Sequence, residues 1–105
     1  MGEALAMGAL AIDGNQGRAF GFSYNQPDRA TARDVALREC GRGCYVVRDF
    51  SSGCAAYAAD QSSGSTVYGW GTATTSVSAQ NIAMDYCRRH GGSRCVVRAW
   101  ACNSR

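Results

Sequence analysis

The chain has no lysine among its 105 residues, and it has only one histidine and one proline. Without lysine, no side-chain amine can form a Schiff base or act as a nucleophile. Any catalytic triad or histidine-based metal site would depend on His90 alone. No apolar run approaches the roughly 20 residues that a membrane-spanning helix needs, so we expect no transmembrane segment.

Charge of either sign is also sparse, with eleven arginines against eight acidic residues and a net charge of +3. A nucleic-acid-binding protein usually shows a concentrated basic stripe and a more strongly basic composition. We therefore expect no nucleic-acid partner. The composition, 46% apolar and 18% charged, is typical of a soluble globular protein of one domain.

The N-terminus lacks the basic start and the long apolar stretch of a signal peptide. A mature form, from which a leader had been removed, would look the same. We expect residues 1–7 to be a tail or the remnant of a leader. Residues 8–104 are expected to form a single disulfide-bonded domain.

The chain does contain an internal similarity between its two halves. Segments 9–13, 20–22, 32–40 and 46–50 resemble segments 56–60, 68–70, 79–87 and 96–100. The interval of about 47 to 50 residues indicates two copies of one supersecondary unit. We expect residues 8–52 and 53–104 to be pseudo-symmetric repeats that share one core.

Each copy is predicted to contain two strands, a helix and a third strand. In the first copy, the pattern favours strands over residues 8–13, 18–24 and 45–50. Asp28 can cap a helix that Gly41 ends. The buried stripe of this helix is expected to hold Ala32, Val35, Ala36 and Cys40.

The second copy has the same predicted order, with strands near residues 55–60, 66–71 and 95–101. Thr75 or Ser76 can cap its helix, which is expected to run to about His90. The residues expected to be buried in it are Ala79, Ile82, Ala83 and Tyr86. The expected fold is one α+β domain, in which about six strands form a single antiparallel or mixed sheet with two helices against it.

Six cysteines suggest a disulfide framework, but their spacing alone does not determine the pairing. They stand at positions 40, 44, 54, 87, 95 and 102. In each copy, one cysteine ends the predicted helix and another lies at or just before the next strand. If the copies share a structure, Cys40–Cys44 and Cys87–Cys95 are local bridges, and Cys54–Cys102 is the remaining pair.

Two alternatives stay open for these cysteines: free thiols, or a zinc site formed by Cys40, Cys44, Cys87 and Cys95. Zinc knuckles favour two to four residues between paired ligands, and the gap between Cys87 and Cys95 is longer. Disulfides persist in oxidising compartments. We therefore expect a secreted or periplasmic protein that holds no metal or other cofactor.

Several short motifs occur in a fixed order with the cysteines. They are Gly8-Ala9-Leu10-Ala11-Ile12, Ala36-Leu37-x-x-Cys40, Cys44-x-Val46-Val47, Cys54-Ala55-Ala56-Tyr57 and Trp100-Ala101-Cys102-Asn103. In this order the chain resembles a family of small exported bacterial domains, known as domain of unknown function four-one-eight-nine. The resemblance implies export through a cleaved leader and a disulfide-bonded fold. It supplies no catalytic residues.

Few residues are candidates for catalysis. Asp13 and Asp60 each end a predicted strand before a turn, and two carboxylates that meet could act as the acid and base of a glycosidase. Aspartate is also common in turns, where it binds backbone N–H groups. His90 lies where a helix is expected to end, a position that favours a cation without any catalytic role. Gly69-Trp70-Gly71 lies inside a predicted strand and is no phosphate-binding loop.

Arginines gather near the predicted helix ends and third strands. They are Arg33, Arg38, Arg42, Arg48, Arg88, Arg89, Arg94 and Arg98. They could bind an acidic partner or a phosphate-bearing polymer. The other interpretation is a solvated face, balanced by neighbouring carboxylates.

Aromatic side chains share one face of the two predicted second strands, opposite small residues. They are Phe20, Phe22, Tyr24, Tyr68 and Trp70. If the helices pack on the aromatic face, these residues are core. If the helices pack on the glycine face, the aromatics form an exposed patch for a partner. Together with Arg88 and Arg89, they are the predicted partner-binding residues.

These observations favour an exported, non-enzymatic binding module that contacts a protein or a cell-envelope component, either as a secreted effector-like protein or as an inhibitor or immunity protein. One alternative is a small cell-wall hydrolase that uses Asp13 and Asp60. Another is a surface protein that forms homo-oligomers through open sheet edges. Nothing in the sequence determines the oligomeric state.

Overall fold

A computed structural model describes residues 6–14 and 18–103 of the chain. The strands are β1 (Met7–Ile12), β2 (Phe20–Gln26), β3 (Tyr45–Ser51), β4 (Cys54–Asp60), β5 (Tyr68–Ala73) and β6 (Cys95–Cys102). The helices are α1 (Arg29–Cys40) and α2 (Ser76–Arg89). Every predicted element is present, although β2 and β5 begin later than expected. β1 begins at Met7, whereas residues 1–5 of the expected tail lie outside the described residues.

The strands form two antiparallel three-stranded sheets, in the orders β2-β1-β3 and β5-β4-β6. The prediction of a single sheet is therefore wrong. Ser52 and Gly53 join β3 to β4 in a tight turn with φ values of 53° and 72°. The turn takes the chain from the edge of the first sheet to the centre of the second, so β3 and β4 do not pair. The relation of the halves by duplication stays a prediction.

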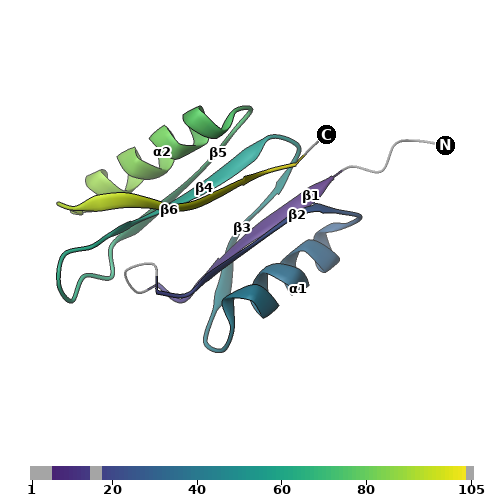
Figure 1. Cartoon of the computed structure of the whole chain (residues 1–105), viewed down its shortest axis with the longest axis horizontal. Coiled ribbons are helices and arrows are strands. Elements are labelled where there is room, and N and C mark those ends of the chain that lie inside the picture. The colour runs from purple at the N-terminus through teal and green to yellow at the C-terminus, as the bar shows by residue number, and fades with distance from the viewer. Residues whose placement is uncertain (1–5, 15–17, 104–105) are drawn as a thin grey trace.

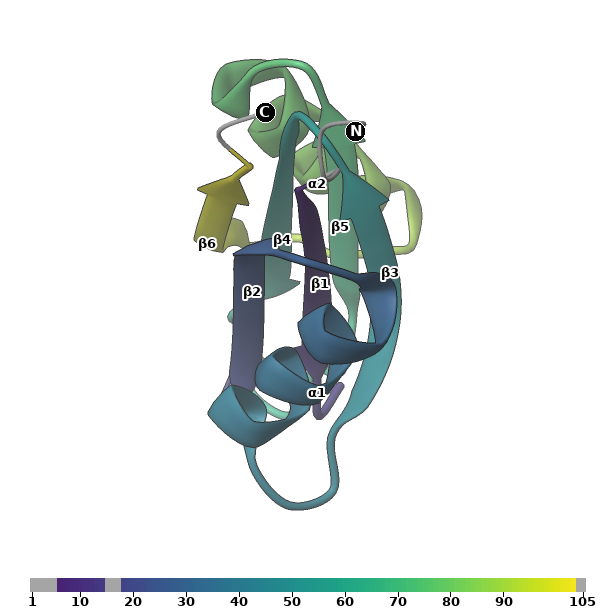
Figure 2. The same cartoon turned by 90° about the vertical axis from the view of Figure 1, so that its right-hand side faces the viewer.

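The sheets stack face to face, and each carries its helix on the outer side (Figure 1). Seen from the end, β2 lies near β6 at one edge of this sandwich, and β3 lies near β5 at the other (Figure 2). At the β2/β6 edge, the backbone N–H of Asn25 donates to Oδ1 of Asn103 at 2.7 Å and so joins the two sheets. The layers are thus helix, sheet, sheet, helix.

Side-chain caps begin both helices, as predicted. Asp28 accepts a hydrogen bond from the N–H of Thr31 at 2.7 Å, and Thr75 accepts one from Ser78 at 3.2 Å. Each cap satisfies a backbone donor that has no partner within the helix. Gly41, with φ 100°, follows the last residue of α1.

The helices lie on the glycine faces of the sheets. A Cβ atom on Gly21 would collide with the carbonyl oxygen of Ala36, and one on Gly69 would collide with the backbone of Ala83 and Cys87. The helix residues that face the sheets are correspondingly small. Fully buried among them are Ala32, Ala36, Ala79, Ala83 and Cys87.

Four helix residues that were expected to be buried, among them Cys40, are half-buried or exposed. Ile82 is 44% exposed, because the sheet-facing stripe of α2 runs through Ala79 and Ala83 and puts Ile82 over the β5 edge, against Gly71. Tyr86, also predicted to be buried, is half-buried. In α1, Val35 is likewise only half-buried.

The second core lies between the two sheets. Its buried residues are Leu10, Ile12, Tyr57 and Ala59, and Phe20, Phe22, Val47, Tyr68 and Trp70 pack around them. The ring of Tyr57 lies 5.8 Å from that of Phe20 and 6.3 Å from that of Tyr68, between ring centroids. These aromatics thus face the opposite sheet, although the ring of Trp70 also lies 5.5 Å from that of Tyr86 of α2, between centroids. Neither simple alternative, helix-packed core or open patch, describes them.

Three disulfides join Cys40 to Cys44, Cys54 to Cys102 and Cys87 to Cys95. These are the pairs that the internal similarity predicts. Cys54 and Cys102 are paired neighbours on β4 and β6, and both local bridges connect the end of a helix to the next strand. The four cysteines of the alternative zinc site are taken up in two of these disulfides.

The long disulfide is expected to stabilise the fold more than a local one. Its cysteines are 48 residues apart, against 4 for Cys40–Cys44, and a longer loop removes more entropy from the unfolded chain. Replacing Cys54 and Cys102 by alanine should lower the free energy of unfolding by about 4 kcal/mol, and replacing Cys40 and Cys44 by about 2 kcal/mol. Urea denaturation of both double variants measures the difference. An equal or reversed order would contradict the ranking.

Candidate functional site

The two edges of the sandwich differ in chemistry, although each is formed by the second strand of one half and the third strand of the other (Figure 2). At the β3/β5 edge, a hydrogen bond between the Tyr68 and Tyr45 hydroxyls, together with burial and neighbouring tyrosines, raises the pKa of Tyr68 to about 12. On the same edge, the Arg48 guanidinium lies 5.4 Å from the ring centroid of Trp70, which is cation–π geometry. Polar and cationic groups therefore close this edge.

The strand pairing shows which residues of β6 match Tyr45 and Arg48 of β3 in position. Ile12 pairs with Tyr45 in the first sheet, and Ala59 pairs with Val96 in the second. Both third strands then contain a bulge, so that Arg48 corresponds to Ala99. The sequence similarity aligns Val46 with Val96, whereas the strand pairing aligns Tyr45 with Val96. The two alignments therefore differ by one residue.

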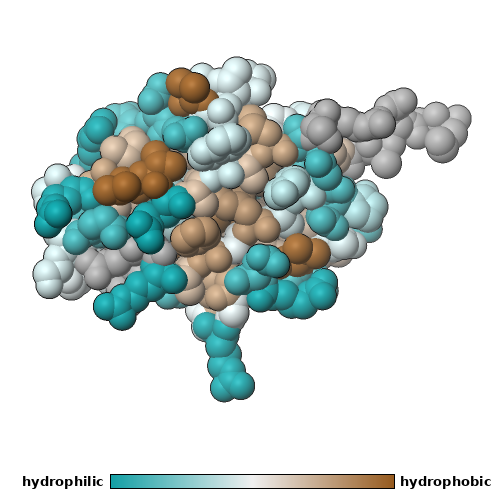
Figure 3. Space-filling view, in the orientation of Figure 1, coloured by the Kyte–Doolittle hydropathy of each residue, from teal (hydrophilic) through white to brown (hydrophobic). Residues whose placement is uncertain are grey.

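Small apolar groups consequently replace the polar ones at the β2/β6 edge. Val96 and Ala99 occupy the places of Tyr45 and Arg48, and the aromatic side chains of β2 lie across from them. Val96 is 45% exposed. Figure 3 shows the face that carries β6 and β2, where apolar surface crosses the middle between hydrophilic margins.

The same register matches Asp49 of β3 with Trp100 of β6. Asp49 faces α1, where it forms ion pairs with Arg33 at 3.0 Å and Arg29 at 3.5 Å. These pairs span the gap between helix and strand, where a depression of about 240 Å³ remains. The second half has a tryptophan in place of the carboxylate, and the indole is 52% exposed.

Trp100 lies in a shallow depression of about 470 Å³. The depression, which we call the Trp100 surface, is lined by Gln80 of α2 and by Val97, Arg98, Ala99 and Trp100 of β6. The Cys54–Cys102 and Cys87–Cys95 disulfides fix both ends of this strand. Covering the exposed half of an indole is worth about 2–3 kcal/mol at roughly 25 cal/mol per Å². The surface is therefore rigid and offers binding energy.

The predicted partner-binding residues do not form one surface. Phe20, Phe22, Tyr68 and Trp70 are half-buried between the sheets, whereas Tyr24 is 52% exposed on β2. Arg88 and Arg89 are exposed at the end of α2, and Arg89 forms an ion pair with Asp85 at 3.1 Å. Sequence reasoning missed Trp100. The sequence similarity matches Trp100 with Phe50, another aromatic residue, and only the strand pairing matches it with Asp49.

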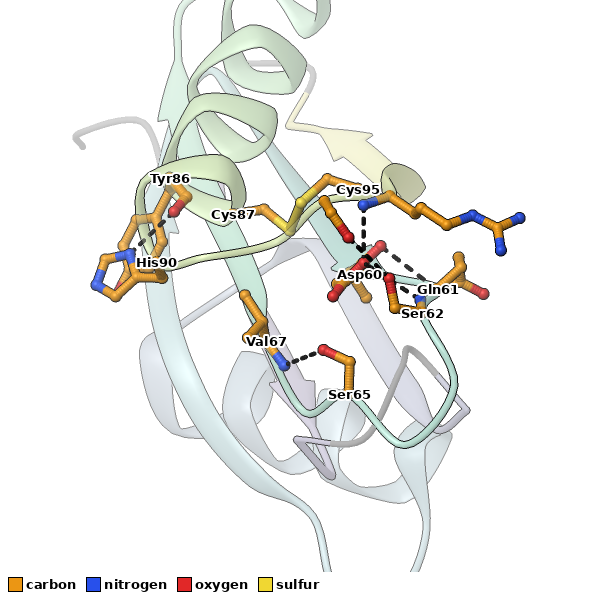
Figure 4. Close-up of a disulfide and its surroundings, with 12 residues drawn as sticks. Asp60, Gln61, Ser62, Ser65, Val67, Tyr86, Cys87, His90 and Cys95 are labelled. Carbon is orange, nitrogen blue, oxygen red and sulfur yellow. Dashed lines mark hydrogen bonds between the residues drawn. A yellow bond between two sulfur atoms is a disulfide. The ribbon is translucent and has the colours of Figure 1, made fainter.

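Asp60 holds a loop in place. It is 3% exposed, and its Oδ1 accepts hydrogen bonds from the N–H of Arg94 at 2.9 Å and from the N–H and hydroxyl of Ser62 at 3.2 and 2.9 Å (Figure 4). Hydrogen bonding, foremost from the Ser65 hydroxyl, lowers its pKa to about 2 against the effect of burial. A carboxyl with so low a pKa is unsuited to act as a general acid near neutral pH.

The other catalytic candidates also have local contacts. Nδ1 of His90 lies 2.9 Å from the carbonyl oxygen of Tyr86, and the two rings stack with centroids 4.5 Å apart (Figure 4). Asp13 follows β1, and its charge adds to burial in raising the pKa of Tyr57 to about 12. Within the described residues, no three His, Cys, Asp or Glu side chains are grouped to hold a metal ion.

The Asp60 contacts predict a loss of stability in acid. Its carboxylate is stabilised only in the folded protein, so its contribution is complete above the unfolded pKa of 3.8 and is lost as the pH falls towards 2. Asp60→Asn should lower the urea midpoint at pH 7 and flatten its dependence on pH between about 4 and 2. The exposed Asp85→Asn is the control and should leave the acid dependence as in the wild type. An unchanged acid dependence in Asp60→Asn would refute this role.

The fold and the cysteine pairing define a disulfide-bonded α+β domain. The chain belongs to the DUF4189 family, a domain of unknown function, which it matches over residues 7–102. The predicted resemblance is thereby confirmed. Within the part of the chain that the structure describes, neither helix is long and apolar enough to cross a membrane.

Similar proteins come from mycobacteria. The chain is 33% identical over 97 residues to Protein Rv1269c of Mycobacterium tuberculosis, and it covers 68% of that protein with 91% of its own length. Protein Mb1300c of Mycobacterium bovis matches with the same values. The NMR structure of Rv1813c from Mycobacterium tuberculosis superposes with a TM-score of 0.67 at 27% identity, over 98% of this chain and 79% of the other.

Proposed function

We propose that the protein is an exported binding module that contacts a macromolecular partner through the Trp100 surface. The observation that carries the proposal is the half-exposed indole of Trp100, held on a strand that disulfides fix at both ends. Tryptophan and arginine are enriched among the residues that dominate binding energy at interfaces. Arg98 lies in the same depression.

The difference between the halves supports this choice of surface. We infer that the halves are pseudo-symmetric copies, since both have the order ββαβ and a bulge at the same place in the third strand. In the first copy, the Arg33–Asp49 ion pair spans the gap between helix and strand, and the depression there is about 240 Å³. In the second copy, Gln80 and Trp100 stand in place of Arg33 and Asp49, and the depression is about 470 Å³.

The three disulfides support export, because such bonds persist at the cell surface, in the periplasm or outside the cell. The partners in these places are proteins and components of the cell envelope. Both can offer an apolar patch for the indole and acceptors for Arg98 and Gln80. A rigid surface also loses little conformational entropy on binding.

The hydrolase alternative receives no comparable support. Asp60, one of its two carboxylates, accepts hydrogen bonds from Ser62 and Arg94 and so anchors the loop that follows β4. His90 is stacked on Tyr86 of its own helix. The alternative of a homo-oligomer is one outcome of the experiment below.

Trp100→Ala tests the proposal. The oxidised protein, immobilised, is exposed to the envelope fraction of the producing cells, and retained material is identified and titrated. We expect a retained species whose affinity falls more than tenfold in Trp100→Ala, a loss of about 1.4 kcal/mol or more. The free energy of unfolding should change by less than about 1 kcal/mol, because the side chain is already half-exposed.

The matched control is Ile82→Ala, another exposed apolar residue, which lies on the β5 side of α2. It should bind as the wild type does. Equal retention by Trp100→Ala would overturn the proposal, and so would the absence of any retained species. Retention of the protein itself, with a doubled mass in solution, would favour the homo-oligomer.

A further inference from the structure

A second depression, of about 460 Å³, lies where the two halves meet. We call it the junction cleft. One side is formed by the start of α1, the end of β3 and the β3–β4 turn, and the other by the end of β5. Its polar residues include Arg29, Arg48, Asp49, Ser52, Thr72 and Thr74. The volume is within the usual range for small-ligand sites, which favour such junctions.

Positive charge predominates in this cleft. Asp49 is its one carboxylate among the described residues, and Arg29 and Arg33 already bind it at 3.5 and 3.0 Å. Arg48 forms no ion pair with any carboxylate of the described residues. Its guanidinium is instead placed by the ring of Trp70, at 5.4 Å. Stacking on an aromatic ring leaves the N–H groups in the guanidinium plane able to donate.

Residues with hydroxyl groups line the same cleft. Ser51 and Ser52 lie on one side of the cleft, and Thr72 and Thr74 on the other. Ser52 has a left-handed backbone with φ 53°, and its N–H donates to the carbonyl oxygen of Ala6 at 3.2 Å. Unusual backbone conformations of this kind cluster at binding sites. The turn therefore has a serine at a position whose left-handed backbone glycine adopts with less strain.

We propose that the junction cleft binds a small phosphate ester of a polyol. The Arg48 guanidinium donates to the phosphate oxygens, with Arg29 as a second cation, because a planar guanidinium matches the geometry of phosphate. The hydroxyls of Ser52, Thr72 and Thr74 bind the polyol. The cleft is several times larger than a phosphate ion, which favours an ester over inorganic phosphate. The proposal is independent of the Trp100 surface.

The test uses the fluorescence of Trp70, which reports on Arg48. Trp70 and Trp100 are the two tryptophans of the chain, so Trp100→Phe serves as the background. Inorganic phosphate and glycerol 3-phosphate are titrated at constant ionic strength against sodium chloride. Shifts of the backbone amide resonances of Ser52, Gly53 and Thr74 locate the site. We expect saturable binding, at least threefold tighter for glycerol 3-phosphate.

Arg48→Gln should weaken this binding at least tenfold. The control is Arg38→Gln, since Arg38 is an exposed arginine of α1 that lies 3.9 Å from Asp34 and outside the cleft. It should bind as the background does. Because Arg48 is exposed, both variants should fold, and their amide spectra verify this. A signal that does not saturate, equal binding by Arg48→Gln, or shifts outside the cleft would each overturn the proposal. Equal affinity for both probes would overturn the polyol part of it.

Discussion

The close approach of each helix to a glycine determines the rest of the structure. Gly21 and Gly69 leave no room for a Cβ atom beneath the helix backbone, so α1 and α2 can only lie on the glycine faces of their sheets. The other face of β2 and β5 carries the aromatic side chains, which are too large to remain in water without cost. The two aromatic faces therefore cover one another, and the sandwich of two sheets follows.

Because the two sheets cover each other's aromatic faces, the sandwich has two long edges, and each edge is a separate surface. Tyr45 and Arg48 close one edge over Tyr68 and Trp70, while small apolar residues stand in the equivalent places at the other. On the outer side of the second sheet, Trp100 replaces a carboxylate that pairs with a helix in the first. The proposed binding surface rests on residues that differ between the halves, more than on those that recur.

Much of the fold could be predicted because its signals are local. Asp28, Thr75 and Gly41 mark helix ends through their own backbone hydrogen bonds or conformation. The disulfides followed from equivalent cysteines in the two halves. The alternation of Phe20, Gly21 and Phe22 showed that the faces of a strand differ. It could not show that a second sheet, and not a helix, would cover the aromatic face, because that depends on contacts distant in sequence.

The candidate site was harder to predict for a related reason. The similarity of the two Val-Val-Arg segments suggests a match that the bulges shift by one residue, and a shift of one residue moves a strand side chain to the opposite face. Only the strand pairing shows that Trp100 corresponds to Asp49. Likewise, the role of Asp60 as a loop anchor depends on Arg94, which is distant in the chain.

The most direct test of the glycine constraint is the stability of Gly69→Ala, compared by urea denaturation with Gly64→Ala. Gly64 has φ 77° and nothing within 4 Å of an added Cβ, so its replacement costs only backbone strain, about 1 kcal/mol. At Gly69 the added methyl group must push α2 away from its sheet. Gly69→Ala should lower the free energy of unfolding by about 1–3 kcal/mol more than Gly64→Ala does. If the two variants were equally stable, close packing of the helix on glycine would not be what orders the layers of this fold.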